Sequence, residues 1–259
     1  MIVPVVGTTP GRRYGHSMAF AKPHLLVFGG NKALNNGSEA ANDVWCLSVE
    51  KAPFSWTKLN CGSETPVARV YHSAALCWTG SATGMMVIFG GRTQDQTALN
   101  DTWGLRRHRD GRWDWVKAPY KSTSVVPTLR YQHTTLFMGP LMFVVGGRTN
   151  NVGEKLPLEV YDTESSEWFK FNALQRFRHV SWSSHLDSKT KLFVHGGFEH
   201  STPNVPLNSV GIVELEKLFA RSEGLMQKVK SAVEKMSRES KTGGKENMTQ
   251  SYKKNAPLA

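Results

Sequence analysis

Cysteine is scarce in this sequence, and long apolar runs are missing from it. Its 259 residues contain three cysteines, Cys46, Cys61 and Cys77, and none of them lies in a CxxC or CxxxH arrangement. An odd number without such spacing argues against a disulfide framework and against a zinc site. The chain does not begin like a signal peptide, and no apolar stretch reaches the ~20 residues that span a membrane. We therefore expect reduced thiols in a cytoplasmic or nuclear protein without a membrane span.

The net charge of +11 is unevenly distributed. Residues 216–259 hold ten lysines and arginines against five glutamates, whereas residues 1–215 hold 22 basic and 16 acidic side chains. Many arginines of the longer part recur at equivalent positions, which is typical of a patterned surface and not of a generic polycation. We expect no specific nucleic-acid binding, and we keep a basic tail that binds nucleic acid or a membrane surface as an alternative.

Apolar residues are plentiful enough for a folded core, and they follow a repeat. Hydrophobic residues make up 39% of the chain and aromatic residues 10%. A short apolar run that ends in a glycine pair occurs four times, at periods of 61, 56 and 50 residues. Self-similarity on this scale indicates a repeat architecture. The pairs are Gly29-Gly30, Gly90-Gly91, Gly146-Gly147 and Gly196-Gly197.

An arginine and a histidine stand upstream of every apolar run, with an aromatic residue between or beside them. These segments are Arg13-Tyr14-Gly15-His16, Arg69-Val70-Tyr71-His72, Arg130-Tyr131-Gln132-His133 and Arg176-Phe177-Arg178-His179. Downstream come a polar loop and a strand-like segment, and three of the repeats end in a tryptophan-bearing strand. Each repeat thus holds about four short β segments, the content of one propeller blade.

The sequence therefore predicts an all-β protein, a kelch-type β-propeller over residues 1–215 with a C-terminal helical tail. The repeat cores cover about 13–60, 69–118, 130–172 and 176–215. The glycine pairs supply backbone angles closed to other residues. Large indole rings fill the gaps between blades. The tryptophans with this structural role are Trp45, Trp56, Trp103, Trp115 and Trp168.

One block within the second repeat is more specific than the repeat itself. It runs Trp103-Gly104-Leu105-Arg106-Arg107-His108-Arg109-Asp110-Gly111-Arg112-Trp113-Asp114-Trp115. With this block and the opening Pro10-Gly11-Arg12-Arg13-Tyr14-Gly15-His16-Ser17, residues 8–200 closely resemble the kelch half of the serine/threonine protein phosphatases with kelch-like domains. These occur in plants, in brassinosteroid signalling, and in apicomplexan and other protists. The resemblance implies a six-bladed propeller that begins before Met1, so we expect a fragment or a shortened product.

The catalytic half of that family carries metallophosphatase motifs of the GDxHG, GDxxDRG and GNHE kind, which hold two metal ions. None of these motifs occurs in the 259 residues. We therefore assign no catalytic residue, metal ligand or cofactor to this chain, and we expect two divalent metals, of the manganese type, only in a missing phosphatase domain. An oxidase of the copper-radical type is disfavoured, because the spacing offers no cluster of Tyr, His and Cys.

Arginines are the main candidates for binding a partner. Because strand direction alternates within a blade, the segment before the first strand and the loop after the glycine pair share one rim. A ring of guanidinium groups there suits carboxylates or phosphates. Alternatively, the four repeated arginines brace their own blades. The candidates are Arg13, Arg69, Arg130 and Arg176 before the first strands, and Arg92 and Arg148 directly after the glycine pairs.

The polar loops after the glycine pairs are the second candidate surface. They cover residues 31–41, 92–99, 148–156 and 198–207, and Phe198, His200 and Asn204 of the last loop are expected to contribute. The four repeated histidines are assigned a bracing role, because equivalent residues of successive blades lie too far apart to share one metal ion. His195 has no equivalent in the other repeats and is expected to be a packed core residue.

The ends of the chain raise the question of ring closure. The apolar start, Ile2-Val3-Pro4-Val5-Val6, is expected to pair with the last blade, which lacks a tryptophan strand. Four blades form either a small ring or an open one whose exposed edges favour association, and the oligomeric state stays open. An apolar stripe predicts an amphipathic helix or linker over 216–239. Residues 240–259 lose this period and are expected to form a disordered basic tail.

The leading interpretation is a regulatory or substrate-recruiting module of a serine/threonine phosphatase. It would bind an acidic or phosphorylated protein segment at the arginine-bearing rim, with its own phosphatase domain as a further partner. The alternative is a free-standing kelch adaptor without a linked enzyme.

Overall fold

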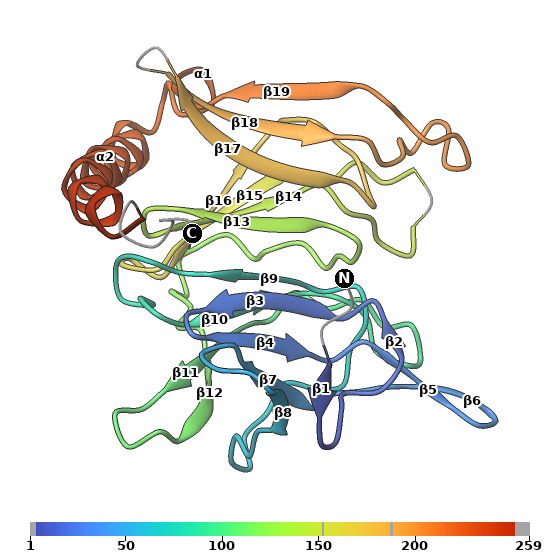
Figure 1. The fold of residues 1–259 in the computed structure, drawn as a ribbon. Helices are drawn as coiled ribbons and strands as arrows, with labels where there is room; N and C mark the ends of the chain where they lie inside the picture. The colour runs from blue at the N-terminus through green and yellow to red at the C-terminus, as the bar shows by residue number, and fades with distance from the viewer. Residues whose placement is uncertain (1–3, 152, 187–188, 252–259) are drawn as a thin grey trace.

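Short antiparallel strands dominate the computed structural model, which describes residues 4–151, 153–186 and 189–251. Four sheets stand side by side like the leaves of an open fan, and the innermost strand of each sheet lies next to that of its neighbour (Figure 1). These sheets are the predicted blades, so the prediction of an all-β kelch propeller is confirmed.

Each blade is built from consecutive strands, with the first strand innermost. Blade 1 consists of β3 (Ser17–Ala21), β4 (His24–Phe28), β7 (Val44–Ser48) and β8 (Phe54–Lys58). Blade 2 consists of β9 (Ser73–Leu76), β10 (Met86–Phe89), β11 (Thr102–Arg107) and β12 (Trp113–Lys117). Blade 3 consists of β13 (Thr134–Met138), β14 (Leu141–Val145), β15 (Leu158–Asp162) and β16 (Glu167–Phe171). Blade 4 has three strands, β17 (Val180–Leu186), β18 (Lys189–His195) and β19 (Val210–Glu214).

The apolar cores lie between the blades. The second strands of the two middle blades, β10 and β14, are buried on both faces between neighbouring sheets, which is why they read as continuous apolar runs. Tryptophans of the following blade close these cores: the Trp115 ring lies 4.9 Å from that of Phe28, and the Trp168 ring 5.2 Å from that of Phe89. Both indoles are buried, as the sequence predicts for plates between blades.

The glycine pairs mark the closest approach of neighbouring blades. Gly90 and Gly146 adopt φ of +59° and +61°, a left-handed conformation that other residues rarely take. A Cβ at Gly90 would lie 2.7 Å from the carbonyl oxygen of Arg130, and one at Gly146 would overlap with that of Arg176. Any side chain here would push the next blade away.

The start of the chain is not where the sequence analysis places it. Strand β1 (Val5–Val6) pairs in parallel with β8, the outer strand of blade 1. For Val5 and Val6 the expected pairing with the last blade is therefore wrong, because the free edge of β8 already accepts them. Ile2 and Val3 lie outside the described residues. No hydrogen bond joins blade 4 to blade 1 in the described part of the chain, and the fan stays open.

The loop after the first glycine pair is also more regular than expected. It forms a hairpin of β5 (Asn31–Leu34) and β6 (Gly37–Ala40), and β5 pairs with β2 (Arg13–Tyr14) at the entry of the same blade.

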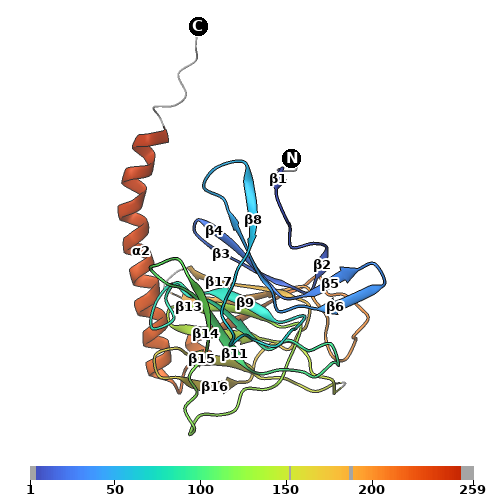
Figure 2. The same cartoon turned by 90° about the horizontal axis from the view of Figure 1, so that it is seen from below.

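Two helices follow the last strand. They are α1 (Leu215–Leu218) and α2 (Glu223–Ser251), and α2 crosses the side of the fan opposite the β5–β6 hairpin (Figures 1 and 2). Leu225 and Val229 are buried against blades 3 and 4, and the Lys228 amine pairs with Asp162 at 2.6 Å and with Glu164 at 2.8 Å. The predicted apolar stripe thus packs on the propeller.

Helix α2 extends past the predicted boundary at residue 239, into the segment expected to be disordered. The packed first part of α2 supplies the helix nucleus, and adding residues to an existing helix is easier than starting one. Most residues of the segment up to Ser251 have no strong preference against a helix. Residues 252–259 of the expected tail lie outside the described residues. Within those that are described, no helix combines the length and apolarity needed to cross a bilayer.

Candidate functional site

Four arginines that begin the repeats point into the blades and not toward a partner. The side chains of Arg69 and Arg130 have no exposed surface, and Arg13 and Arg176 are almost covered. Three of them pair with an acid of their own blade: Arg13 with Asp43 at 2.7 Å, Arg69 with Asp101 at 2.6 Å, and Arg130 with Glu159 at 2.8 Å. The expectation that these four arginines form a binding ring is corrected, and the bracing alternative describes them.

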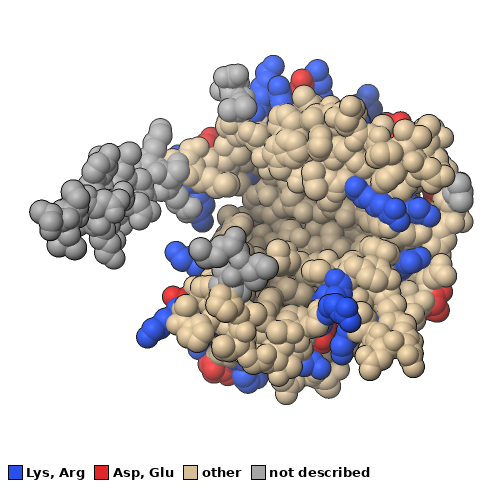
Figure 3. Space-filling view, turned by 45° about the vertical axis from the view of Figure 1, so that its right-hand side comes forward, with Lys and Arg blue, Asp and Glu red and all other residues tan. Residues whose placement is uncertain are grey.

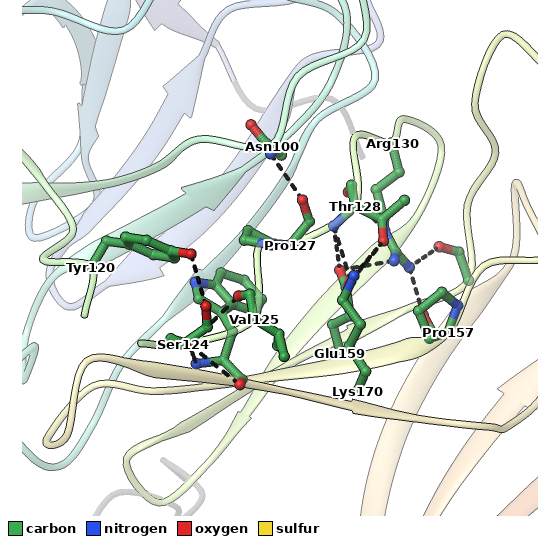
Figure 4. Close-up of polar contacts among 12 residues, drawn as sticks. Asn100, Tyr120, Ser124, Val125, Pro127, Thr128, Arg130, Pro157, Glu159 and Lys170 are labelled. Carbon is green, nitrogen blue, oxygen red and sulfur yellow. Dashed lines mark hydrogen bonds and ion pairs between the residues drawn. The ribbon is translucent and has the colours of Figure 1, made fainter. Parts of the chain in front are cut away.

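The Arg130–Glu159 pair is the most enclosed of these braces (Figure 4). The Arg130 guanidinium donates to the carbonyl oxygens of Gly146 and Pro157, both at 2.9 Å. The Glu159 carboxylate accepts from the backbone N–H and the hydroxyl of Thr128, at 2.9 and 2.8 Å. One buried ion pair thus fixes the entry segment of blade 3 to its second and third strands.

Blade 4 lacks the acid of the other braces. Ser209 stands where the other repeats have Asp43, Asp101 and Glu159, and its hydroxyl accepts from Arg176 at 3.0 Å. A second Arg176 nitrogen donates to the Ser209 carbonyl at 2.9 Å. The buried charge of Arg176 therefore has no counter-ion among the described residues.

We expect Ser209→Asp to stabilise the protein. The new carboxylate would meet Arg176 as Asp101 meets Arg69, and a charge-assisted hydrogen bond contributes about 1.5–3 kcal/mol, part of which is offset by desolvation of the acid. A net gain of about 1 kcal/mol corresponds to a rise of roughly 2–4 °C in the melting temperature. Calorimetry of both proteins measures this shift. Ser209→Asn, which adds no charge, is the control, and an equal shift in both variants would contradict the ion-pair explanation.

The repeated histidines connect neighbouring blades. The Nε2 atoms of His72, His133 and His179 lie 2.6, 2.7 and 3.0 Å from hydroxyl oxygens of the preceding blade. Burial lowers the pKa of His72 to about 3 and that of His179 to about 4, with the repeated arginines adding to the effect. Among the described residues, no group of His, Cys, Asp or Glu is arranged to hold a metal ion.

Arg92 and Arg148 differ from the braces in position and in partners. Each forms an isolated β-bridge to the entry segment of its own blade, Arg92 with Val70 and Arg148 with Tyr131. Each lies over two aromatic rings from neighbouring blades. The Arg92 guanidinium carbon is 5.4 Å from the Tyr71 ring centre and 5.3 Å from that of Tyr131. The Arg148 carbon is 5.5 Å from the Tyr131 centre and 5.2 Å from that of Phe177.

These five side chains form what we call the rim ladder, in which aromatic rings and guanidinium groups alternate across blades 2, 3 and 4. The ladder consists of Tyr71, Arg92, Tyr131, Arg148 and Phe177. Stacking on aromatic faces holds a guanidinium in place and leaves its N–H edge available. Figure 3, which brings this side of the molecule forward, shows a hollow within the fan with basic groups around it.

The ladder arginines lack acidic partners. In the part of the chain that the structure describes, the side chains of Arg92 and Arg148 form no ion pair. Their one side-chain hydrogen bond there is a long one, from Arg92 to the Gln96 side chain at 3.4 Å. Both are only partly buried. Aromatic rings therefore hold these two arginines in place without the ion pairs that three of the braces have.

The last loop joins the end of the ladder. The Phe198 ring stacks on Phe177 at 5.6 Å, and the His200 ring lies 5.3 Å from Phe177. Phe198 thus lies directly beside the ladder, and its contribution to binding stays a prediction. Asn204 is exposed in the same loop and is not part of the ladder.

Sequence reasoning missed Tyr71, Tyr131 and Phe177 as ladder members, and it missed Arg178. Arg178 is exposed, lies 5.9 Å from the Phe198 ring, and lines a pocket of about 300 Å³ beside Gln132 and His179. The signal for the ladder was present in the aromatic residue that recurs one or two positions after each repeated arginine. Its alternation with Arg92 and Arg148 appears only when neighbouring blades are placed side by side.

Comparison with known proteins agrees with this architecture. Residues 35–218 match the family model "KLHDC2/KLHL20/DRC7 Kelch-repeats domain". The chain is 35% identical over 170 residues to serine/threonine-protein phosphatase BSL2 of Arabidopsis thaliana, covering 64% of this chain and 16% of that protein. It is 30% identical over 135 residues to dynein regulatory complex subunit 7 of Chlamydomonas reinhardtii, covering 52% of this chain and 11% of that protein.

The chain thus spans less than a fifth of the length of these relatives. The resemblance to a kelch-containing phosphatase is confirmed, and the matched region is a kelch domain and not a catalytic fold. Kelch domains bind other proteins. From its blades, its glycine pairs and the family model that covers most of its length, the chain belongs to the kelch-repeat family.

Proposed function

We propose that this protein binds an acidic or phosphorylated segment of another protein at the rim ladder. The observation that carries the proposal is the pair Arg92 and Arg148, stacked between aromatic rings and in no ion pair among the described residues. A guanidinium with a free N–H edge can bind a carboxylate or phosphate through two hydrogen bonds. Because the rings already fix the arginines, binding requires little further ordering of side chains.

The similarity to BSL2 supports a more specific form of this proposal. In it, the propeller regulates a serine/threonine phosphatase or recruits its substrates, and the two divalent metals belong to a phosphatase domain outside this chain. We place this function in the cytoplasm or nucleus, where the three buried thiols would stay reduced. The second candidate is a kelch adaptor without a linked enzyme, which the similarity to dynein regulatory complex subunit 7 favours.

Charge reversal of the ladder tests the binding site. We expect the double variant Arg92→Glu, Arg148→Glu to lose at least about tenfold in affinity for phosphoserine peptides, since each charge-assisted hydrogen bond contributes about 1.5–3 kcal/mol. Fluorescence anisotropy with peptide pools that carry a central phosphoserine, glutamate or serine measures the loss. The control is the double variant Arg109→Glu, Arg221→Glu, an equal charge change at two exposed positions outside the ladder.

Two results would contradict this site. Equal binding of the serine and phosphoserine pools would show that the protein does not recognise the negative charge. Unchanged affinity of the double variant would show that the rim ladder is not the binding site. The link to a phosphatase has a separate test, namely the transcript sequence beyond both ends of this segment. Metallophosphatase motifs in the same reading frame would support a regulatory module of a phosphatase. Their absence would support the kelch adaptor without a linked enzyme.

A further inference from the structure

The three junctions between blades share one hydrogen-bond pattern. At each of them, the second glycine of a pair donates its N–H to the carbonyl of the arginine that begins the next repeat. These bonds run from Gly30 to Arg69 at 2.9 Å, from Gly91 to Arg130 at 2.9 Å, and from Gly147 to Arg176 at 2.7 Å. Each blade therefore offers a donor at its exit side and an acceptor at its entry side.

A second set of bonds links the blades around the hollow. The residue before each repeated histidine donates its N–H to the carbonyl of the equivalent residue in the preceding blade. The pairs are Tyr71 to Gly15 at 2.8 Å, Gln132 to Tyr71 at 2.8 Å, and Arg178 to Gln132 at 3.0 Å. This set also has a direction, from each blade to the one before it.

Both patterns stop at the two ends of the fan. On blade 4, the N–H of Gly197 and the carbonyl of Arg178 bond to no other blade in the described part of the chain. On blade 1, the carbonyl of Arg13 and the N–H of Gly15 likewise bond to no other blade there. By the internal pattern, the Gly197 N–H of blade 4 would match the Arg13 carbonyl of blade 1. The Arg178 carbonyl of blade 4 would match the Gly15 N–H of blade 1.

The apolar surfaces at these ends are also uncovered. Strand register places Val180, His195 and Val210 in one row across the outer face of blade 4, with Trp182, Phe193 and Ile212 in the next row. Val180, Trp182, Val210 and Ile212 are 44–58% exposed. On blade 1, Met18 and Phe20 of β3 are 57% and 48% exposed. Exposed apolar patches of this kind mark interaction surfaces.

His195 belongs to this uncovered face. The equivalent residues Phe28 and Phe89 pack against the histidine ring of the following blade, at 5.1 and 5.3 Å. His195 has no following blade and is exposed. The expectation that it is a packed core residue is therefore wrong.

We propose that the outer face of blade 4 binds blade 1 of a second copy of this chain, through the same contacts that join the blades internally. This chain carries both halves of the junction, and the polar groups of the two halves match. Two such contacts around a two-fold axis would close a ring of eight blades, which lies within the usual range of about 4–8. This dimer is independent of the rim ladder.

Blade 4 differs from the other blades at one position that affects the strength of the contact between copies. Ser17, Ser73 and Thr134 provide the hydroxyl that bonds the next histidine, whereas Val180 stands at the equivalent position of blade 4. The contact between copies therefore lacks this hydrogen bond and is weaker than an internal junction. The association depends on concentration.

Sedimentation equilibrium of the full chain tests the proposal. Up to about 100 µM, a range that detects micromolar association, the wild type should approach twice its chain mass of 28.9 kDa. Trp182→Glu and Phe20→Glu, which block the blade 4 and blade 1 faces respectively, should each remain monomeric. An equimolar mixture of the two should form a dimer, because one intact junction remains. Trp78→Glu, at an exposed tryptophan of blade 2, is the control and should associate like the wild type.

Each outcome decides the proposal. A wild type that stays monomeric throughout this range overturns it, including the case in which blade 4 binds its own blade 1. A wild-type dimer whose two variants do not complement each other also overturns it, because the contact would then lie elsewhere. If circular dichroism shows that Trp182→Glu is unfolded, Ile212→Glu on the same face replaces it.

Discussion

Lowering the pH from 7 to 5 is expected to cost this protein on the order of 6 kcal/mol of folding stability, through three buried histidines. Burial holds the pKa of His72 and His179 at about 3 and about 4, and that of His133 well below its usual value. Neutral imidazoles thus connect the blades, whereas an unfolded histidine binds a proton below a pH of about 6.5. A loss of this size is comparable to the whole stability of a typical domain, about 5–15 kcal/mol.

The sign follows from proton binding. Because the folded-state pKa values are depressed, the stabilisation is fully present above a pH of about 6.5 and is lost as the pH falls toward the folded values. Between these limits each histidine removes about 1.4 kcal/mol per pH unit. Urea unfolding at pH 7, 6 and 5 measures the slope.

Two variants isolate the histidines. His72→Gln should reduce the pH slope by about a third, whatever it does to the stability at pH 7. His133→Gln should reduce it by a similar amount. If the wild-type stability does not change between pH 7 and 5, the buried imidazoles do not control it.

Glu159→Gln should cost about 3–5 kcal/mol, because removing one member of a buried ion pair leaves the other charge without compensation. Neither Arg130 nor Glu159 has exposed side-chain surface, and the remaining partners of Arg130 are backbone carbonyls. The amide is close in size to the carboxylate, so packing changes little and the effect reports the charge. Urea unfolding at pH 7 measures the loss.

The chain contains a matched control for this effect. Arg106 and Asp114 form a two-bond pair at 3.0 and 2.7 Å, but on the surface of blade 2, with 42% and 35% of their side chains exposed. Exposed pairs contribute about 0–1 kcal/mol. Asp114→Asn should therefore have a small effect, and equal losses in both variants would show that enclosure does not decide the value of the pair.

The blades could be predicted because the residues that determine each blade lie within a single repeat. The glycine pairs, the apolar strands and the tryptophans act within one blade or at one junction, and they recur at similar spacing. The arginine braces could also have been found. Asp43, Asp101 and Glu159 follow their arginines at 30, 32 and 29 residues in the sequence, a recurrence that points to a partner within the blade.

The rim ladder could not be read in the same way. Arg92 lies between Tyr71 of its own blade and Tyr131 of the next, so the site depends on how blades are placed side by side. The pairing of β1 depends on which strand edge is free, and a stretch as short as Val5-Val6 does not encode that choice. Spacing within one repeat contains neither kind of information.

Helix α2 makes the two ends of the fan unequal. Its buried face packs against blades 3 and 4, and Lys228 pairs with Asp162 of blade 3. The helix therefore stabilises the third junction, whereas no helix packs on the first junction in the described part of the chain. In an array where each unit gains stability from its neighbours, the units with the fewest neighbours open first. Blade 1 has one neighbouring blade and no helix packed on its junction, so it is the end that unfolds first. Helix α2 stabilises the opposite end, blade 4.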